Sequence, residues 1–134
     1  MSSGFGSDPI YQGRLTPDNA KLLVRNSSSA NQKFPLNQIR AIIGRSDDAP
    51  MSIEDIDLTE CKIDNKSAIS RRHAVIEWVE GKLQIIDLDS TNGTFVNGKK
   101  LLTTAPRQPS SPEILKSGDI IKLGNIELEV IADG

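Results

Sequence analysis

Apolar residues of this chain recur in short, strand-length runs, and no stretch shows the 3.6-residue period of an amphipathic helix. The clearest run is IELEVI, in which Ile126, Leu128 and Val130 alternate with two glutamates. That alternation is typical of a half-solvated antiparallel strand. The other runs lie at 21–25, 39–44, 73–79, 82–88, 94–96 and 119–123. The pattern therefore predicts an all-β protein built from many short strands.

The connections between these runs carry turn signals. Asn97-Gly98 and Gly124-Asn125 are two-residue links of the kind that supplies positive φ in tight hairpins. Such links join strands that are neighbours and antiparallel. We therefore expect an antiparallel β-sandwich of two packed sheets.

The amino-acid composition excludes several classes of function. The 134 residues are enough for one domain. With 16 basic and 18 acidic side chains, the net charge of -2 argues against a general nucleic-acid binder. The single Cys61 cannot form an internal disulfide, which fits a reducing compartment. No apolar stretch approaches the roughly 20 residues of a membrane span, and MSSGFGSDP lacks a basic region and an apolar run, so the sequence predicts a cytoplasmic protein without membrane contact.

One expected hairpin gathers polar residues at one end of the sandwich. The strand at 73–79 runs to a turn at 80–81, and the strand at 82–88 returns beside it. The residues before 73 and after 88 must therefore be neighbours, which places SRR at 70–72 beside STNG at 90–93. Hydroxyls, an amide, arginines and a glycine-bearing turn are the groups that hold an oxyanion such as a phosphate. The hairpin thus predicts a local anion site.

Three motifs, in order and in register, carry a resemblance to a known family. They are GR at 44–45, SRRH at 70–73 and STNGTFVNG at 90–98, and together they resemble the forkhead-associated (FHA) domain. The resemblance implies a β-sandwich of about eleven strands whose loops at one end bind a phosphothreonine peptide, with no cofactor. We expect an FHA domain at 20–134, after a flexible tail at 1–19 that is rich in Ser, Gly and Pro.

Carried over residue by residue, the resemblance implies five phosphopeptide contacts. Arg45 would be the cation beside the phosphate, and Arg71 a second basic contact. Ser70 and Thr91 would supply hydroxyls at or near the phosphate. Asn92 would hold the backbone of the peptide.

The resemblance also implies structural support of the site. Gly44 and His73 would be architectural, the histidine by fixing the binding loops, and Gly93, Asn97 and Gly98 would shape turns. His73 has neither a nucleophile motif such as G-x-S-x-G nor a metal-site companion in the sequence. We therefore expect no catalytic residue and no metal site, and we expect that the protein is not an enzyme.

The function that follows is a signalling adaptor. Its partner would be a phosphothreonine-containing protein, either a substrate of a Ser/Thr kinase or the kinase itself. The alternative is a scaffold with the same fold that binds partners or itself without phosphate. The stretch after Arg45 is longer and more acidic than is usual in the family, which leaves the preferred peptide undetermined.

Overall fold

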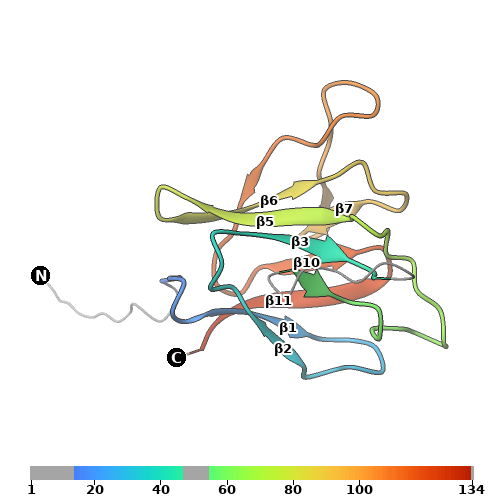
Figure 1. The fold of residues 1–134 in the computed structure, drawn as a ribbon, viewed down its shortest axis with the longest axis horizontal. Coiled ribbons are helices and arrows are strands. Elements are labelled where there is room, and N and C mark those ends of the chain that lie inside the picture. Colours follow the sequence, from blue (N-terminus) through green and yellow to red (C-terminus); the bar gives the residue numbers. More distant parts are fainter. Residues whose placement is uncertain (1–13, 47–54, 134) are drawn as a thin grey trace, which may run out of the picture.

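Two β-sheets packed face to face make up the described part of the chain (Figure 1). The computed structural model describes residues 14–46 and 55–133, whereas residues 1–13, 47–54 and 134 lie outside the described residues. The strands in the described residues are β1 (Ala20–Val24), β2 (Lys33–Pro35), β3 (Arg40–Gly44), β4 (Ile56–Asp57), β5 (Ala74–Val79), β6 (Lys82–Asp87), β7 (Thr94–Val96), β8 (Lys99–Lys100), β9 (Glu113–Ile114), β10 (Ile120–Leu123) and β11 (Ile126–Ala132). Within those ranges no helix is long and apolar enough to cross a membrane.

In the described part of the chain, the sheets have six and five strands. The larger has the order β2-β1-β11-β10-β7-β8, and the smaller the order β4-β3-β5-β6-β9. The predicted all-β sandwich is confirmed, and each apolar run of the sequence lies on a strand. β2, β4, β8 and β9 are only two or three residues long, too short for alternation to show in the sequence.

One strand pair departs from the antiparallel prediction. β4 runs parallel to β3, with Ile43 opposite Ile56. A parallel pair needs a longer connection than a hairpin, because the chain must return to the end from which it started. The segment 45–55 provides that length, so the smaller sheet is mixed.

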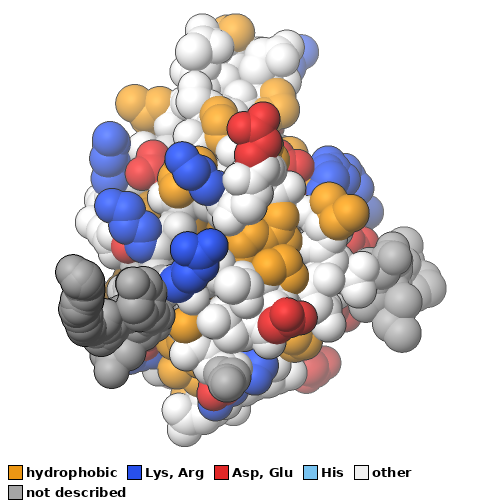
Figure 2. All heavy atoms as spheres, turned by 90° about the vertical axis from the view of Figure 1, so that its left-hand side faces the viewer, with side chains coloured by type: hydrophobic (Ala, Val, Ile, Leu, Met, Phe, Trp, Pro, Cys, Tyr) orange, Lys and Arg blue, Asp and Glu red, His pale blue; other side chains and the backbone are white. Residues whose placement is uncertain are grey.

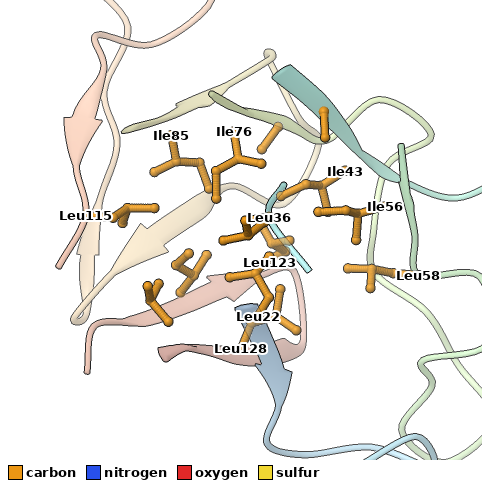
Figure 3. Close-up of a cluster of buried hydrophobic side chains, with 14 of the residues drawn as sticks. Leu22, Leu36, Ile43, Ile56, Leu58, Ile76, Ile85, Leu115, Leu123 and Leu128 are labelled. Atoms are coloured by element: carbon orange, nitrogen blue, oxygen red, sulfur yellow. The ribbon is translucent and has the colours of Figure 1, made fainter. Parts of the chain in front are cut away.

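The core lies between the sheets and is filled by alternate residues of the strands from both (Figure 3). Side chains labelled in Figure 3 include Leu22, Ile43, Ile76, Ile85, Leu123 and Leu128. The alternation predicted for β11 is confirmed, since Ile126, Leu128 and Val130 are fully buried. Trp78 is half-buried, packs against this core and donates its indole N–H to the Leu36 carbonyl at 2.8 Å.

Tight turns set the register of the hairpins. Glu80 and Gly81 have φ of +52° and +80°, and Asn97 and Gly98 have φ of +51° and +84°, as two-residue hairpin turns require. In the 124–125 link the positive φ is confined to the glycine. The β5–β6 turn and the residues before β1 lie at one end of the sandwich, and the loops that follow β3 and β6 lie at the other (Figure 1).

Part of the predicted tail is packed onto the domain. Leu15 is partly buried against the core, and the Asn19 side chain accepts the Thr16 N–H at 2.8 Å. Residues 1–13 of the predicted tail lie outside the described residues. The boundary at 19–20 therefore stays a prediction.

Apolar side chains also reach the surface at the end that carries the β5–β6 turn (Figure 2). A shallow pocket of about 310 Å³, here the pole pocket, opens there. Its lining consists of Leu15, Trp78, Gly81, Lys82, Leu83, Ile114, Leu115 and Lys116. The molecule thus presents an apolar surface far from the loops after β3 and β6.

Core packing makes a first prediction. Leu128 is fully buried in β11, so Leu128→Ala should lower the free energy of unfolding by about 2–5 kcal/mol, through lost apolar burial and the cavity left behind. Urea denaturation measures this. Leu102→Ala is the matched control, because Leu102 is 70% exposed and its loss should change stability by no more than about 0.5 kcal/mol. Equal effects of the two substitutions would contradict the assigned core.

Candidate functional site

A small polar pocket lies at the end of the sandwich opposite the pole pocket. It has a volume of about 210 Å³ and is built by the loops after β3, before β5 and after β6. Its lining residues are Arg45, Ser67, Ala68, Ile69, Ser70, Thr91 and Asn92. Four of the five predicted contacts are thus gathered around one hollow. The fifth, Arg71, is an exposed residue directly after Ser70 and does not line it.

Ser70 joins two of the loops. Its Oγ accepts the backbone N–H of Thr91 at 3.0 Å, and its own N–H is donated to Nδ1 of His73 at 3.1 Å. A hydroxyl that accepts one hydrogen bond still has a hydrogen to donate. Ser70 can therefore hold the Thr91 loop and offer its O–H to an anion at once.

His73 fixes the same loops from the interior of the domain. The ring is fully buried, and Nε2 lies 2.8 Å from the Gly93 carbonyl oxygen. Because Nδ1 accepts the Ser70 N–H, the ring is neutral with its proton on Nε2, which donates to Gly93. Burial lowers the pKa of His73, although the bond to Gly93 and the charge of Asp87 act in the opposite direction. His73 thus bridges the two loops, and its part in supporting a binding site stays a prediction.

Gly44 allows the loops to meet. A Cβ atom at this position would lie 1.8 Å from the carbonyl oxygen of Arg71, so only glycine permits this approach of the two backbones. The close contact places Arg45 directly beside the loop that carries Ser70. Gly93, with φ of +91°, likewise has a backbone conformation that favours glycine.

Asp87 organises the loop after β6, although no role was predicted for it from the sequence. Its buried carboxylate accepts the Ser90 N–H at 3.1 Å and the Ser90 and Thr94 hydroxyls at 2.6 Å each. The Ser90 Oγ in turn accepts the Gly93 N–H at 2.9 Å. Aspartate favours turns because its carboxylate accepts nearby backbone N–H groups, and this preference was the available signal.

The loop before β5 has two further anchors that sequence reasoning missed. Asn92 donates its side-chain N–H to the Ala68 carbonyl at 3.0 Å. On the other side, the Asn125 Oδ1 accepts the Ala68 N–H at 3.2 Å. No local sequence signal links positions this far apart.

The Asn97-Gly98 turn lies at the far end of β7 from Thr94, where that strand meets β8. Asn97 donates to the Asp119 carboxylate at 3.0 Å and accepts the Ile120 N–H at 2.9 Å. The turn thus holds the start of β10. Its predicted part in supporting the site stays a prediction.

A larger cavity offers less suitable chemistry. It has a volume of about 510 Å³ and lies between the β1–β2 loop and the segment after β4. Its lining residues are Asn26, Ser27, Ser28, Glu60, Lys62, Ile63, Asp64 and Asn65. Two carboxylates face one lysine there, which disfavours an anion. Among the described residues, no group of three or more His, Cys, Asp or Glu side chains could hold a metal ion.

Comparison with known families decides the relationship of this chain. A model of the FHA domain matches residues 41–124, which is more than half of the sequence and includes all three motifs around the pocket. The chain belongs to the FHA domain family. Within it, the oxoglutarate dehydrogenase inhibitor of Corynebacterium efficiens is similar, with 30% identity over 132 residues, or 97% of this chain and 79% of that protein.

Solved FHA domains have the same sandwich. One, from a study of phosphothreonine-dependent FHA domain interactions, matches with a TM-score of 0.57 at 28% identity and covers 87% of this chain and 98% of its own. EmbR of Mycobacterium tuberculosis, solved in complex with a low-affinity phosphopeptide, matches with a TM-score of 0.63 at 27% identity. That match covers 87% of this chain and 25% of EmbR.

Because His73 is buried, the stability of this FHA domain should depend on pH. The unfolded chain takes up a proton near the ordinary pKa of 6.5, whereas the folded domain takes it up only at lower pH. The free energy of unfolding should therefore be highest above pH 6.5 and fall as the pH drops below that value. Urea denaturation at pH 7.5 and 5.5 measures the difference.

The control is His73→Gln, which leaves the chain without histidine. This variant should be less stable throughout and should lose the change between pH 7.5 and 5.5. Asp57 and Asp133 also have lowered pKa values, but their ordinary value of 3.8 places them below this range. The same pH dependence in both proteins would rule out His73 as its source.

Proposed function

We propose that this FHA domain binds phosphothreonine on partner proteins and acts as a signalling adaptor. The observation that carries the proposal is the pocket at the loop end. There Arg45, the hydroxyls of Ser70 and Thr91, and the amide of Asn92 surround a hollow of about 210 Å³. Such a hollow is large enough for a phosphate group.

The donors suit the charge of a phosphate monoester. A phosphorylated side chain carries about -1.5 to -2 charge and three acceptor oxygens at neutral pH. Arg45 is half-buried, so its charge is screened less than that of a fully exposed arginine. Hydrogen bonds to charged groups contribute roughly 1.5–3 kcal/mol each, so three or four of them can support micromolar affinity.

The apolar part of the pocket lining supports a preference for phosphothreonine over phosphoserine. Ala68 and Ile69 line the pocket beside the polar groups. If they contact the γ-methyl of phosphothreonine, that methyl adds about 0.8 kcal/mol, or roughly fourfold in affinity. A larger preference would require that the methyl also orients the phosphate.

The partner class follows from this chemistry. It is a protein that carries phosphothreonine, either a substrate of a Ser/Thr kinase or the kinase itself, and a cytoplasmic location fits such signalling. The family match supports the proposal, as do the study of phosphothreonine-dependent interactions of one related solved FHA domain and the phosphopeptide complex of EmbR. Binding needs no cofactor, and the domain acts as a reader without catalysis.

Fluorescence anisotropy with degenerate peptide pools tests the proposal. Phosphothreonine, phosphoserine and unphosphorylated pools are titrated with the wild-type protein and with Arg45→Ala. Binding should require the phosphate, favour phosphothreonine and fall at least tenfold in Arg45→Ala, because a charge-assisted contact of about 1.5–3 kcal/mol is lost.

Arg40→Ala is the matched control. Arg40 lies at the other end of β3, is exposed and is 3.8 Å from Glu77, a surface pair of little energetic weight. Arg40→Ala changes the net charge by the same amount as Arg45→Ala, and this variant should bind like the wild type. Equal binding of all three pools would favour the phosphate-independent scaffold, for which the pole pocket offers a surface.

Affinity should also depend on pH and salt. The second pKa of the phosphate is about 6, so the dianion that the pocket binds best is lost as the pH falls from 7.5 to 5.5. Added salt screens the attraction between the phosphate and Arg45. Titration of one phosphothreonine peptide at both pH values, at low and high salt, should give the tightest binding at pH 7.5 and low salt. Constant affinity across these conditions would argue against an ionic contact.

A further inference from the structure

Three asparagines form a chain of hydrogen bonds from the β1–β2 loop to the pocket. Asn26 donates its side-chain N–H to the Asn125 carbonyl at 3.3 Å. The Asn125 Oδ1 accepts the Ala68 N–H at 3.2 Å, and its Nδ2 donates to the Lys66 carbonyl at 3.4 Å. Asn92 then donates to the Ala68 carbonyl at 3.0 Å. Ala68 is thus held by Asn125 through its N–H and by Asn92 through its C=O.

The turn that carries Asn125 packs tightly against Ala68. A Cβ atom on Gly124 would lie 2.2 Å from the Ala68 carbonyl oxygen, so the glycine is needed for this approach. The position of that oxygen therefore depends on the 124–125 turn. Because Asn92 bonds to the same oxygen, the turn also sets the direction of the Asn92 amide.

The Asn92 side chain can still form hydrogen bonds to a ligand in this arrangement. An amide has two donor hydrogens and an oxygen with two lone pairs, and the bond to Ala68 occupies one hydrogen. The other groups are available to a peptide backbone. Their direction is determined by the bond to Ala68.

We infer that Asn125 is a positioning residue for phosphopeptide recognition, and that it acts through Ala68 on Asn92. The inference rests on the proposed function. Without Asn125, the Ala68 N–H loses its partner and the loop before β5 populates other conformations. The apparent affinity for the peptide then falls with the fraction of molecules whose loop is competent to bind.

A double-mutant cycle tests the inference. Asn125→Ala, Asn92→Ala and the double variant are titrated by anisotropy with the tightest-binding phosphothreonine peptide from the pool. Asn125→Ala should bind about tenfold more weakly, the effect of losing hydrogen bonds of ordinary strength. Because Asn125 acts through Asn92, the double variant should be weakened by clearly less than the product of the two single effects. Alanine fits the turn, since Asn125 does not have a positive φ.

Asn19→Ala is the matched control. Asn19 makes the same two kinds of bond, accepting the Thr16 N–H at 2.8 Å and donating to the Arg14 carbonyl at 3.1 Å. It lies just before Ala20, which pairs with Ala132 at the end of β11 away from the pocket. The affinity of Asn19→Ala for the peptide should equal that of the wild type. Wild-type affinity of Asn125→Ala, or fully multiplicative effects in the cycle, would overturn the inference.

NMR spectra of the unliganded protein separate this inference from the proposed function. If the wild type binds no phosphopeptide, the proposed function fails, but the Asn92 side-chain amide signals still report on its position. Asn125→Ala should shift those signals and Asn19→Ala should not, and unshifted signals in Asn125→Ala would refute the link. Should Asn125→Ala not fold, hydrogen exchange of the wild-type Ala68 amide decides: slow exchange supports the bond to Asn125, and exchange at the rate of an open loop overturns it.

Discussion

A buried imidazole holds together the end of this domain that carries the small polar pocket. The ring of His73 accepts the N–H of Ser70 and donates to the carbonyl of Gly93, so two loops from different strands share one rigid partner. The ring is fully buried, and each of these backbone groups would be costly to leave unpaired. The spacing of the two loops is therefore set by the width of one ring.

The rest of the pocket is built outward from this bridge. The Asp87 carboxylate fixes the loop after β6 from within, and the 124–125 turn fixes the loop before β5 from its other side. Gly44 brings the backbone of β3 into contact with Arg71. The backbone N–H groups of Ala68, Ser70 and Thr91 thus bond within the protein. Under the proposed function, side-chain hydroxyls, a guanidinium and an amide on these fixed loops donate to the ligand.

Such a site suits reversible recognition. The pocket is shallow and polar, and its donors are held in place before a ligand arrives, which reduces the ordering cost of binding. Under the proposed function, its affinity depends on the charge of the ligand, and hence on whether a kinase has acted. The sandwich itself contributes rigidity, because the strands that end at the pocket are anchored in a continuous core.

The strands and the convergence at one hairpin could be read from the sequence, because both follow from local rules. Side chains alternate along a strand, and the two ends of a hairpin must meet, so the alternation of Ile126, Leu128 and Val130 and the closeness of Ser70 to Thr91 were predictable. The parallel pairing of β4, the role of Asp87 and the contact of Asn125 with Ala68 were not. These depend on how loops separated by many residues pack against each other. Hydrogen bonds between such distant positions leave no periodic pattern, so only the tertiary structure decides them.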